Sequence, residues 1–127
     1  MPNSPRNEFF YFNDDAELVA LRYANMKFVY CEQRQPGLLA VWNEPFICLR
    51  APKMFNLRMD PYERADFDSN TYWDWAIRHS YYVVPTQDIV ANFLSTFKDY
   101  PPRQRPSSFS VDQIIEKFMN ATTPKGQ

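Results

Sequence analysis

The chain contains little glycine, histidine or cysteine, and each shortage excludes a class of functional site. Two glycines in 127 residues are too few to build a phosphate-binding loop or a dinucleotide-binding fingerprint. His79 is the single histidine, which excludes a histidine-based catalytic triad or a multi-histidine metal site within one chain. No apolar run is long enough to span a bilayer, and a net charge of −1 lacks the basic excess of a general nucleic-acid binder.

The two cysteines, Cys31 and Cys48, are too few and too far apart in sequence for a metal knuckle or a redox pair. Each lies in a segment typical of a β-strand, where a buried free thiol is the ordinary outcome. A disulfide is the alternative if the two strands are neighbours, because a bridge requires the two Cα atoms to lie within about 7 Å. The sequence favours free thiols and leaves the bridge open.

Proline and aromatic residues are abundant instead. Eleven prolines beside so few glycines indicate rigid turns and firm element boundaries, and aromatic residues make up 17% of the chain. A composition of 45% hydrophobic and 23% charged residues is typical of a soluble globular protein. The length predicts a single domain over residues 1–127.

The first half of the chain has the pattern of β-strands. An aromatic run is ended by the turn formers Asn13, Asp14 and Asp15, and the next two runs follow with short connections, which predicts an antiparallel meander. Gln35-Pro36-Gly37 predicts a turn, and Asp60-Pro61 predicts a type I turn after the last strand. The predicted strands are 8–12, 17–23, 27–32 and 53–57, with 39–42 and 46–49 as further candidates.

The second half has the pattern of helices. One helix is predicted from Thr71 to about Tyr82, with a capping-box-like start in which Asp74 follows Thr71. Pro85 is expected to open a second helix, and Ser110 a third. The expected apolar faces are Ile89, Val90, Phe93, Leu94 and Phe97 in the second helix, and Ile114, Ile115, Phe118 and Met119 in the third.

These patterns together predict an α+β fold. An antiparallel β-sheet of about four strands, at about 8–57, is followed by two or three helices packed on one face. The helical part is expected at about 70–120, with a flexible tail at 121–127.

Aromatic side chains surround the first predicted helix, so it should be buried on more than one side. One side is expected to pack on the sheet, while the other could cover a partner domain, line a pocket for an aryl or sterol group, or be exposed. Partner-domain packing is favoured, because a large apolar patch usually marks an interface. His79 is most simply a packed, hydrogen-bonded imidazole, and the alternative places it at an interdomain seam or cleft rim. The aromatic residues are Tyr72, Trp73, Trp75, Tyr81 and Tyr82.

Residues 52–66 combine a predicted strand, a proline turn and a charged segment after the turn. This segment resembles the motif that opens the tail of the C-terminal subdomain in the arylsulfatase family, of the alkaline-phosphatase-like superfamily. Further segments similar to that family follow the same order and cover nearly the whole chain; they are 6–15, 18–23, 70–75 and 97–104. The residues that carry the motif are Phe55, Asn56, Leu57, Asp60, Pro61 and Glu63.

The resemblance implies a C-terminal, non-catalytic subdomain of an enzyme that hydrolyses sulfate esters with calcium and a formylglycine. Such a subdomain packs beside the catalytic domain and helps to shape the substrate cleft; the residues expected at the interdomain seam or cleft rim are Tyr72, Trp73, Trp75 and His79. Neither cysteine fits the Cys/Ser-x-Pro-x-Arg motif that yields formylglycine, so we expect no catalytic, cofactor or metal residues in this chain and no activity from it alone.

The expected partner is the sulfatase catalytic domain, or a second copy through an exposed aromatic face. The alternative function is a free-standing binding or interaction module that kept the fold without the enzyme. Members of this family are often exported to the periplasm or secreted, but the sequence leaves the compartment open.

Overall fold

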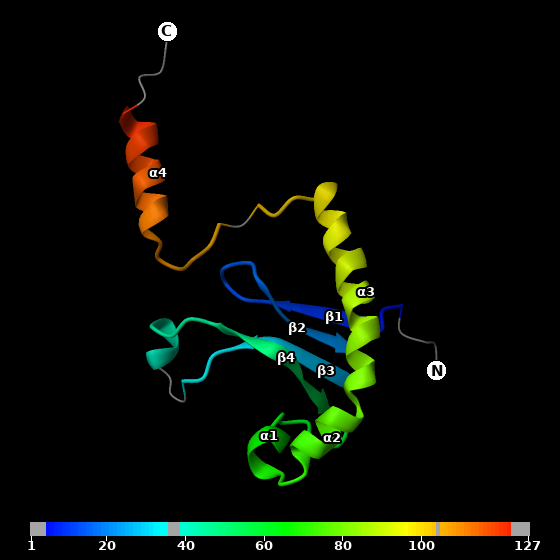
Figure 1. The fold of residues 1–127 in the computed structure, drawn as a ribbon. Helices are drawn as coiled ribbons and strands as arrows, with labels where there is room; N and C mark the ends of the chain where they lie inside the picture. Colours follow the sequence, from blue (N-terminus) through cyan, green and yellow to red (C-terminus); the bar gives the residue numbers. More distant parts are fainter. Residues whose placement is uncertain (1–4, 36–38, 104, 123–127) are drawn as a thin grey trace.

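A computed structural model describes residues 5–35, 39–103 and 105–122. It contains a four-stranded antiparallel sheet in the order β1-β2-β3-β4, followed by helices, which confirms the predicted α+β fold (Figure 1). The strands are β1 (Glu8–Phe12), β2 (Leu18–Tyr23), β3 (Met26–Glu32) and β4 (Ile47–Asn56). The helices are α1 (Ala65–Asp68), α2 (Tyr72–Arg78), α3 (Val83–Ser95) and α4 (Val111–Thr122), with 3-10 turns η1 (Ala40–Trp42), η2 (Ser80–Tyr82) and η3 (Thr96–Lys98).

Local turn chemistry connects the first strands as the sequence indicates. The Asn13 side-chain oxygen accepts hydrogen bonds from the backbone N–H of Asp15 at 3.1 Å and of Glu17 at 2.8 Å. This arrangement lets the chain reverse between β1 and β2 without a glycine. Pro36 and Gly37, where another turn is predicted, lie outside the described residues.

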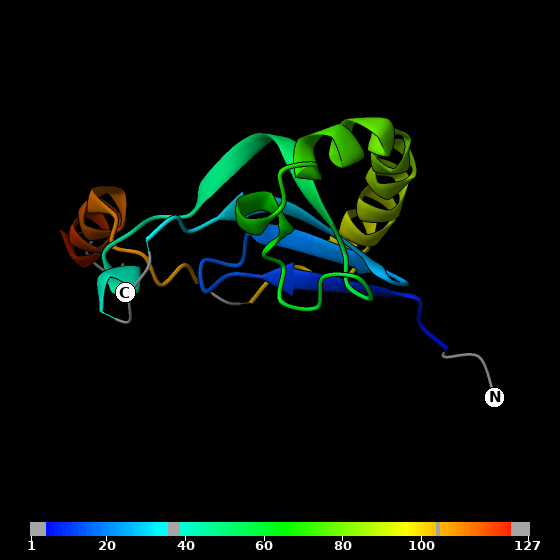
Figure 2. The same cartoon turned by 90° about the horizontal axis from the view of Figure 1, so that it is seen from below.

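The fourth strand differs from the prediction. Residues 40–42 form η1 rather than a strand, and residues 47–56 form one continuous strand that contains Pro52. Pro52 is tolerated because it lies in an edge strand, within the register interruption, where it has no partner in β3. The register against β3 shifts between Val29 and Cys31, and β4 arches away from β3 there (Figure 2).

Apolar residues from all four strands form one face of the sheet, and α3 covers it. Phe10, Leu21, Phe28 and Met54 follow one another across the register, and the last three are buried. The Phe10 ring stacks on Phe93 of α3 with 3.9 Å between centroids. This face is the main hydrophobic core.

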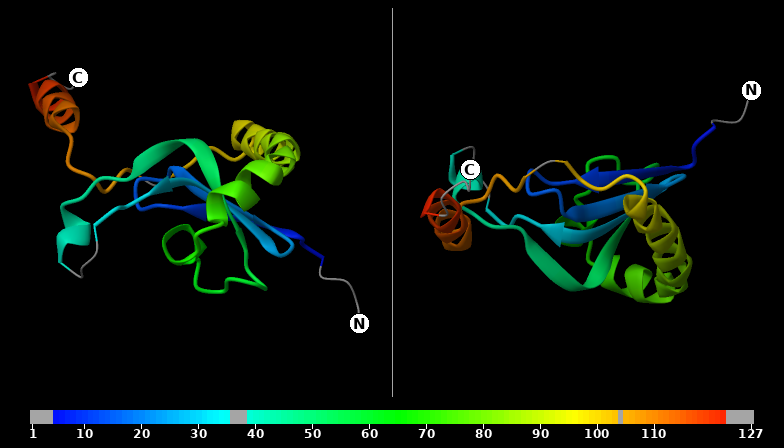
Figure 3. Two further views of the ribbon diagram at one scale, coloured as in Figure 1. Left: turned by 60° about the horizontal axis from the view of Figure 1, so that its bottom comes forward. Right: turned by 90° about the horizontal axis from the view of Figure 1, so that it is seen from above.

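The opposite face of the sheet is covered by a segment in which no helix was predicted. Ala20 and Phe55 are buried there, and residues 57–71, with the short helix α1, cross over it. Figure 3 shows α1 and α3 on opposite sides of the sheet. The sheet is therefore the middle layer of the domain.

The helical half departs from the prediction at its boundaries. The predicted helix 71–82 is divided at His79 into α2 and η2, and Thr71 makes no side-chain capping bond, so the capping-box prediction there is wrong. The second helix begins at Val83, two residues before Pro85; Pro85 still lies in the first turn, where its missing N–H has no intrahelical partner.

The last helix, α4, forms where a third helix is predicted. It lies away from the sheet, at the end of an extended segment that follows η3 (Figure 1). It continues to Thr122, so residues 121 and 122 are helical rather than part of a tail, and residues 123–127 lie outside the described part. Within the described residues, no helix has the length and apolar character needed to cross a membrane.

Candidate functional site

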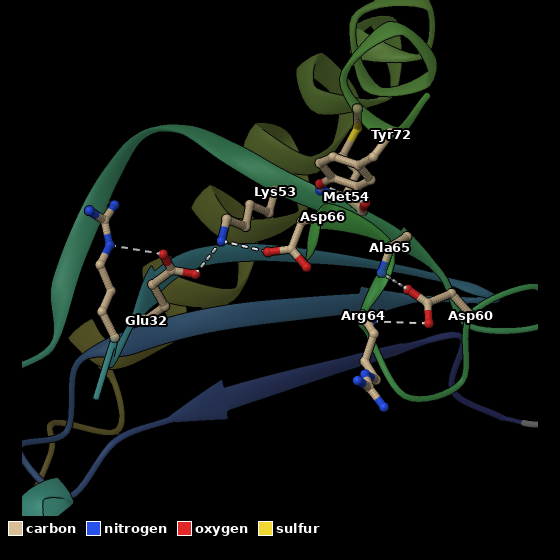
Figure 4. A network of polar contacts seen from close by, with 9 residues as sticks. Glu32, Lys53, Met54, Asp60, Arg64, Ala65, Asp66 and Tyr72 are labelled. Atoms are coloured by element: carbon tan, nitrogen blue, oxygen red, sulfur yellow. Dashed lines mark hydrogen bonds and ion pairs between the residues drawn. The ribbon is translucent and has the colours of Figure 1, made fainter. Parts of the chain in front are cut away.

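A lysine clamp joins the covering segment to the sheet. Lys53 of β4 donates hydrogen bonds to Glu32 of β3 at 2.7 Å and to Asp66 of α1 at 2.8 Å (Figure 4). The Asp66 side chain is 5% exposed and that of Lys53 is 14% exposed. Burial lowers the pKa of Lys53, but the hydrogen bonds and charges of Asp66 and Glu32 outweigh it, so the pKa is raised and the ammonium form is stabilised. The clamp fixes α1 over the face of the sheet opposite α3.

The Asp60 turn forms the entry to α1. The backbone N–H of Glu63 donates to the Asp60 carbonyl at 3.2 Å, which confirms a turn with aspartate first and proline second. The Asp60 carboxylate accepts the N–H of Arg64 at 3.1 Å and of Ala65 at 2.8 Å, so it caps α1 (Figure 4). Glu63 has a φ of 55° and places its carboxylate 2.7 Å from the ammonium of Lys27 on β3.

The Tyr72 hydroxyl protects the outer edge of β4. It donates to the Met54 carbonyl and accepts the Met54 N–H, each at 3.1 Å (Figure 4). Its ring stacks on Phe55 with 5.7 Å between centroids, and the residue is buried. An unpaired strand edge invites pairing with another chain. Tyr72 therefore covers the strand edge at Met54, and the same contacts attach α2 to the sheet.

Tyr72→Phe should isolate the contribution of this hydroxyl, because the ring against Phe55 is kept. We expect the free energy of unfolding to fall by about 2 kcal/mol, since the buried N–H and C=O of Met54 lose their partner. Urea denaturation measures this. Tyr62→Phe is the matched control, because its side chain is 83% exposed, and it should change stability by less than about 0.5 kcal/mol. Equal losses in the two variants would contradict the role of Tyr72.

A small cavity of about 160 Å³ connects the family-like motif with two of the predicted rim residues. Phe55, Asn56 and Asp60 line it from the β4 side, and Tyr72 and Trp75 line it from the α2 side. Of the other motif residues, Leu57 is half-buried, Pro61 is exposed and Glu63 pairs with Lys27.

His79 belongs to an aromatic stack and does not line the small cavity. Its Nδ1 lies 2.7 Å from the Trp75 carbonyl, and its ring centroid lies 4.8 Å from that of Trp75. The Tyr82 ring is parallel to it, with 6.2 Å between centroids and an angle of 4°. This confirms the packed, hydrogen-bonded imidazole predicted from the sequence.

The other side of α2 and η2 is an exposed apolar surface, which we call the helical patch. Trp73, Ile77 and Tyr81 are 60%, 71% and 61% exposed, and Val84 at the start of α3 is 65% exposed. Tyr72 fixes α2 to the sheet, and Tyr81 of the patch is in ring contact with His79 and Tyr82 of the aromatic stack. The patch is therefore a firmly supported surface.

A larger groove of about 840 Å³ opens where β4 arches away from β3. Trp73 is the one predicted rim residue that lines it, so the four candidates do not share one site. The groove and the lysine clamp beside it were missed by sequence reasoning. Lys53 was the one signal in the sequence for the clamp, because it is a charged residue within an apolar strand. It is one position from Met54, so the two side chains lie on opposite faces of the sheet. The lining residues are Glu32, Gln33, Arg34, Gln35, Leu49, Arg50, Ala51, Lys53, Phe67 and Trp73.

A disulfide joins Cys31 and Cys48, so the expectation of free thiols is wrong. The two residues are direct partners in the β3–β4 register, with 3.9 Å between Cα atoms. The bridge closes the strand pair beyond the β4 arch. The residues that follow the two cysteines, Glu32 and Leu49, line the groove.

The extended segment before α4 is attached to the β1–β2 turn by two serines. Ser107 donates its hydroxyl to the Asp14 carbonyl at 3.0 Å, and the Ser108 N–H donates to the Asp15 carboxylate at 2.6 Å. The Ser108 hydroxyl also donates to this carboxylate. These Ser108 hydrogen bonds lower the pKa of Asp15 below its usual value.

Acid should release this attachment. A carboxylate with a lowered pKa in the folded state stabilises the contact above its unfolded pKa, and the effect is lost as pH falls through the folded value. In an NMR titration from neutral to acidic pH, we expect the Ser108 amide to lose its bonded chemical shift with a midpoint below 3.8, the ordinary value for aspartate. Asp15→Asn should abolish this titration. A midpoint at or above 3.8 would contradict the prediction.

Within the described residues, no group of three or more His, Cys, Asp and Glu side chains is arranged to hold a metal ion. Comparison with known proteins adds no relative: no protein-family model, characterised protein or solved structure matches the chain. The likeness to the arylsulfatase C-terminal subdomain therefore rests on the sequence alone, in segments 6–15, 18–23, 52–66, 70–75 and 97–104.

Proposed function

We propose that this chain is the C-terminal, non-catalytic subdomain of an arylsulfatase. It supports the catalytic domain of an enzyme that hydrolyses sulfate esters and forms part of the rim of the substrate cleft. The observation that carries this proposal, beside the sequence resemblance, is the helical patch. Its exposed apolar side chains belong to α2, η2 and the start of α3, and Tyr72 attaches α2 to the sheet.

The helical patch has the chemistry of a buried interface. Ile77 is 71% exposed and Tyr81 is 61% exposed. Apolar side chains exposed together on one element are typical of a protein–protein contact. Because the patch is held by Tyr72 and the aromatic stack, little ordering would be needed on docking, which favours association.

The disulfide supports a non-catalytic role for this chain. Both sulfur atoms are in the Cys31–Cys48 bridge, so neither is available for conversion to formylglycine. The nucleophile and the calcium ligands would come from the catalytic domain. A bridge also persists best in an oxidising compartment, which agrees with export of the parent enzyme.

The direct test is assembly with a sulfatase catalytic domain. We would co-express the 127-residue chain with a family catalytic domain that lacks its own C-terminal subdomain, then measure co-elution and hydrolysis of 4-nitrophenyl sulfate. We expect a complex, and no turnover from the chain alone. Ile77→Ser with Tyr81→Ser should weaken co-elution at least about tenfold. Tyr62→Ser, in an exposed turn away from the patch, is the control. Turnover by the pure chain, or a complex equally sensitive to both variants, would contradict the proposal.

A free-standing binding module is the second candidate, and the groove beside Lys53 is the observation that favours it. Immunoblotting of the source organism separates the two. A native polypeptide several times larger than 15.1 kDa would support the sulfatase subdomain, and a species near that mass would support the separate module.

A further inference from the structure

The groove exists because the β3–β4 register is interrupted. Val29 pairs with Lys53 and Cys31 pairs with Cys48, so β4 has more residues than β3 between these two pairs. The extra residues form the arch seen in Figure 2 and leave an open space of about 840 Å³. This volume is in the range of pockets that hold small organic ligands.

The groove carries an excess of positive charge. Arg34, Arg50 and Lys53 line it, and Glu32 is the one acidic residue among the described lining residues. Beside the groove, the buried Asp66 pairs with Lys53, so the two arginines face a single further carboxylate. Arg34 contacts Glu32 through Nε alone, at 3.1 Å, so its terminal guanidinium nitrogens are not used in that pair. Arg50 makes no ion pair with any described carboxylate. Guanidinium groups of this kind bind carboxylates, sulfonates and sulfates through paired N–H donors.

Two aromatic side chains flank the same space. Phe67 is 85% exposed and Trp73 is 60% exposed, and both line the groove from the covering segment and α2. The Lys53 ammonium lies 5.5 Å from the centroid of the Phe67 ring. The residues that precede them in sequence, Asp66 and Tyr72, are held by the lysine clamp and by the hydrogen bonds to Met54. Such rings offer planar apolar surface to another ring.

We propose that this groove binds an aromatic anion, with the ring of the ligand against Phe67 and Trp73 and its acidic group at Arg34 and Arg50. The volume admits a fused ring system, and the charge selects an anion over a neutral aromatic compound. This inference depends on the groove alone, so it stands or fails independently of the sulfatase assignment.

Calorimetric titration of the 127-residue chain with naphthalene-2-sulfonate and naphthalene-2-carboxylate tests the proposal. We expect saturable one-to-one binding of both, because the shared chemistry is an aromatic anion. Inorganic sulfate has the charge without the ring, and 2-naphthol has the ring without the charge at neutral pH. Each should bind at least about tenfold more weakly, since one of the two contacts is lost.

Two variant pairs locate the binding. Arg50→Gln and Phe67→Ala should each weaken naphthalene-2-sulfonate binding about tenfold, as expected for loss of a charged hydrogen bond or an aromatic contact. Arg58→Gln and Tyr62→Ala are the matched controls, since both residues are exposed and neither lines the groove. Absence of saturable binding, sulfate or 2-naphthol binding as tightly as the sulfonate, or equal effects of test and control variants would overturn the proposal.

Discussion

Lys53→Met should destabilise the domain by about 3 kcal/mol, because it leaves a buried charge without its partner. The Asp66 side chain is 5% exposed and pairs with Lys53 at 2.8 Å, so removal of the ammonium leaves a buried carboxylate without its charged partner. Methionine keeps the length of the side chain, which limits any packing loss. Urea denaturation monitored by tryptophan fluorescence gives the free energy of unfolding.

Two further variants identify the cause of this loss. Arg64→Met breaks an ion pair with Asp68 whose side chains are 70% and 58% exposed, and it should cost less than about 1 kcal/mol. Asp66→Asn in the Lys53→Met background should restore part of the stability, because the uncompensated charge is removed. If Lys53→Met were no worse than Arg64→Met, the clamp would not hold α1 to the sheet.

Loss of the Cys31–Cys48 bridge should lower the free energy of unfolding by about 3 kcal/mol, the value for a loop of similar length. The two cysteines are separated by 17 positions, and the enclosed chain includes η1 and the residues leading into β4. Without the bridge, the unfolded chain gains conformational freedom. Cys31→Ser with Cys48→Ser should reproduce the effect of reduction in the native sequence.

Thiol counting gives a direct check on the bridge. Under denaturing conditions, the native chain should show no reactive thiol before reduction and two afterwards, because both cysteines are in the bridge. Reductant should leave the stability of the double serine variant unchanged. Two reactive thiols before reduction would show that the bridge is absent in solution.

The two proposed surfaces meet at Trp73, which belongs to the helical patch and also lines the groove. The helical patch uses Ile77 and Tyr81 on the outer side of α2 and η2, whereas the groove uses Arg50 and Phe67 beside the β4 arch. Because each surface is tested with its own residues, failure of one proposal leaves the other interpretable.

Local sequence chemistry was sufficient for the antiparallel meander and for most of its turns. The Asn13 side chain makes the hydrogen bonds expected of a turn former, and Asp60-Pro61 produces the expected turn. The capping box predicted at Thr71 failed because its side chain makes no bond to the helix start, and the Ser69 hydroxyl accepts the Thr71 N–H instead. Such competition between adjacent polar side chains is not visible in a sequence pattern.

The sequence by itself determined the α+β order of the elements and the aromatic character of α2. It also determined the alternation that places Met54 and Lys53 on opposite faces of β4. These features depend on residues close in sequence. The tertiary structure decided the Cys31–Cys48 bridge, the lysine clamp and the groove. Each depends on strand register, and the β4 arch changes that register between Val29 and Cys31. A shift in register alters which side chains meet across two strands, and hydrophobic periodicity alone does not specify it where a strand is irregular.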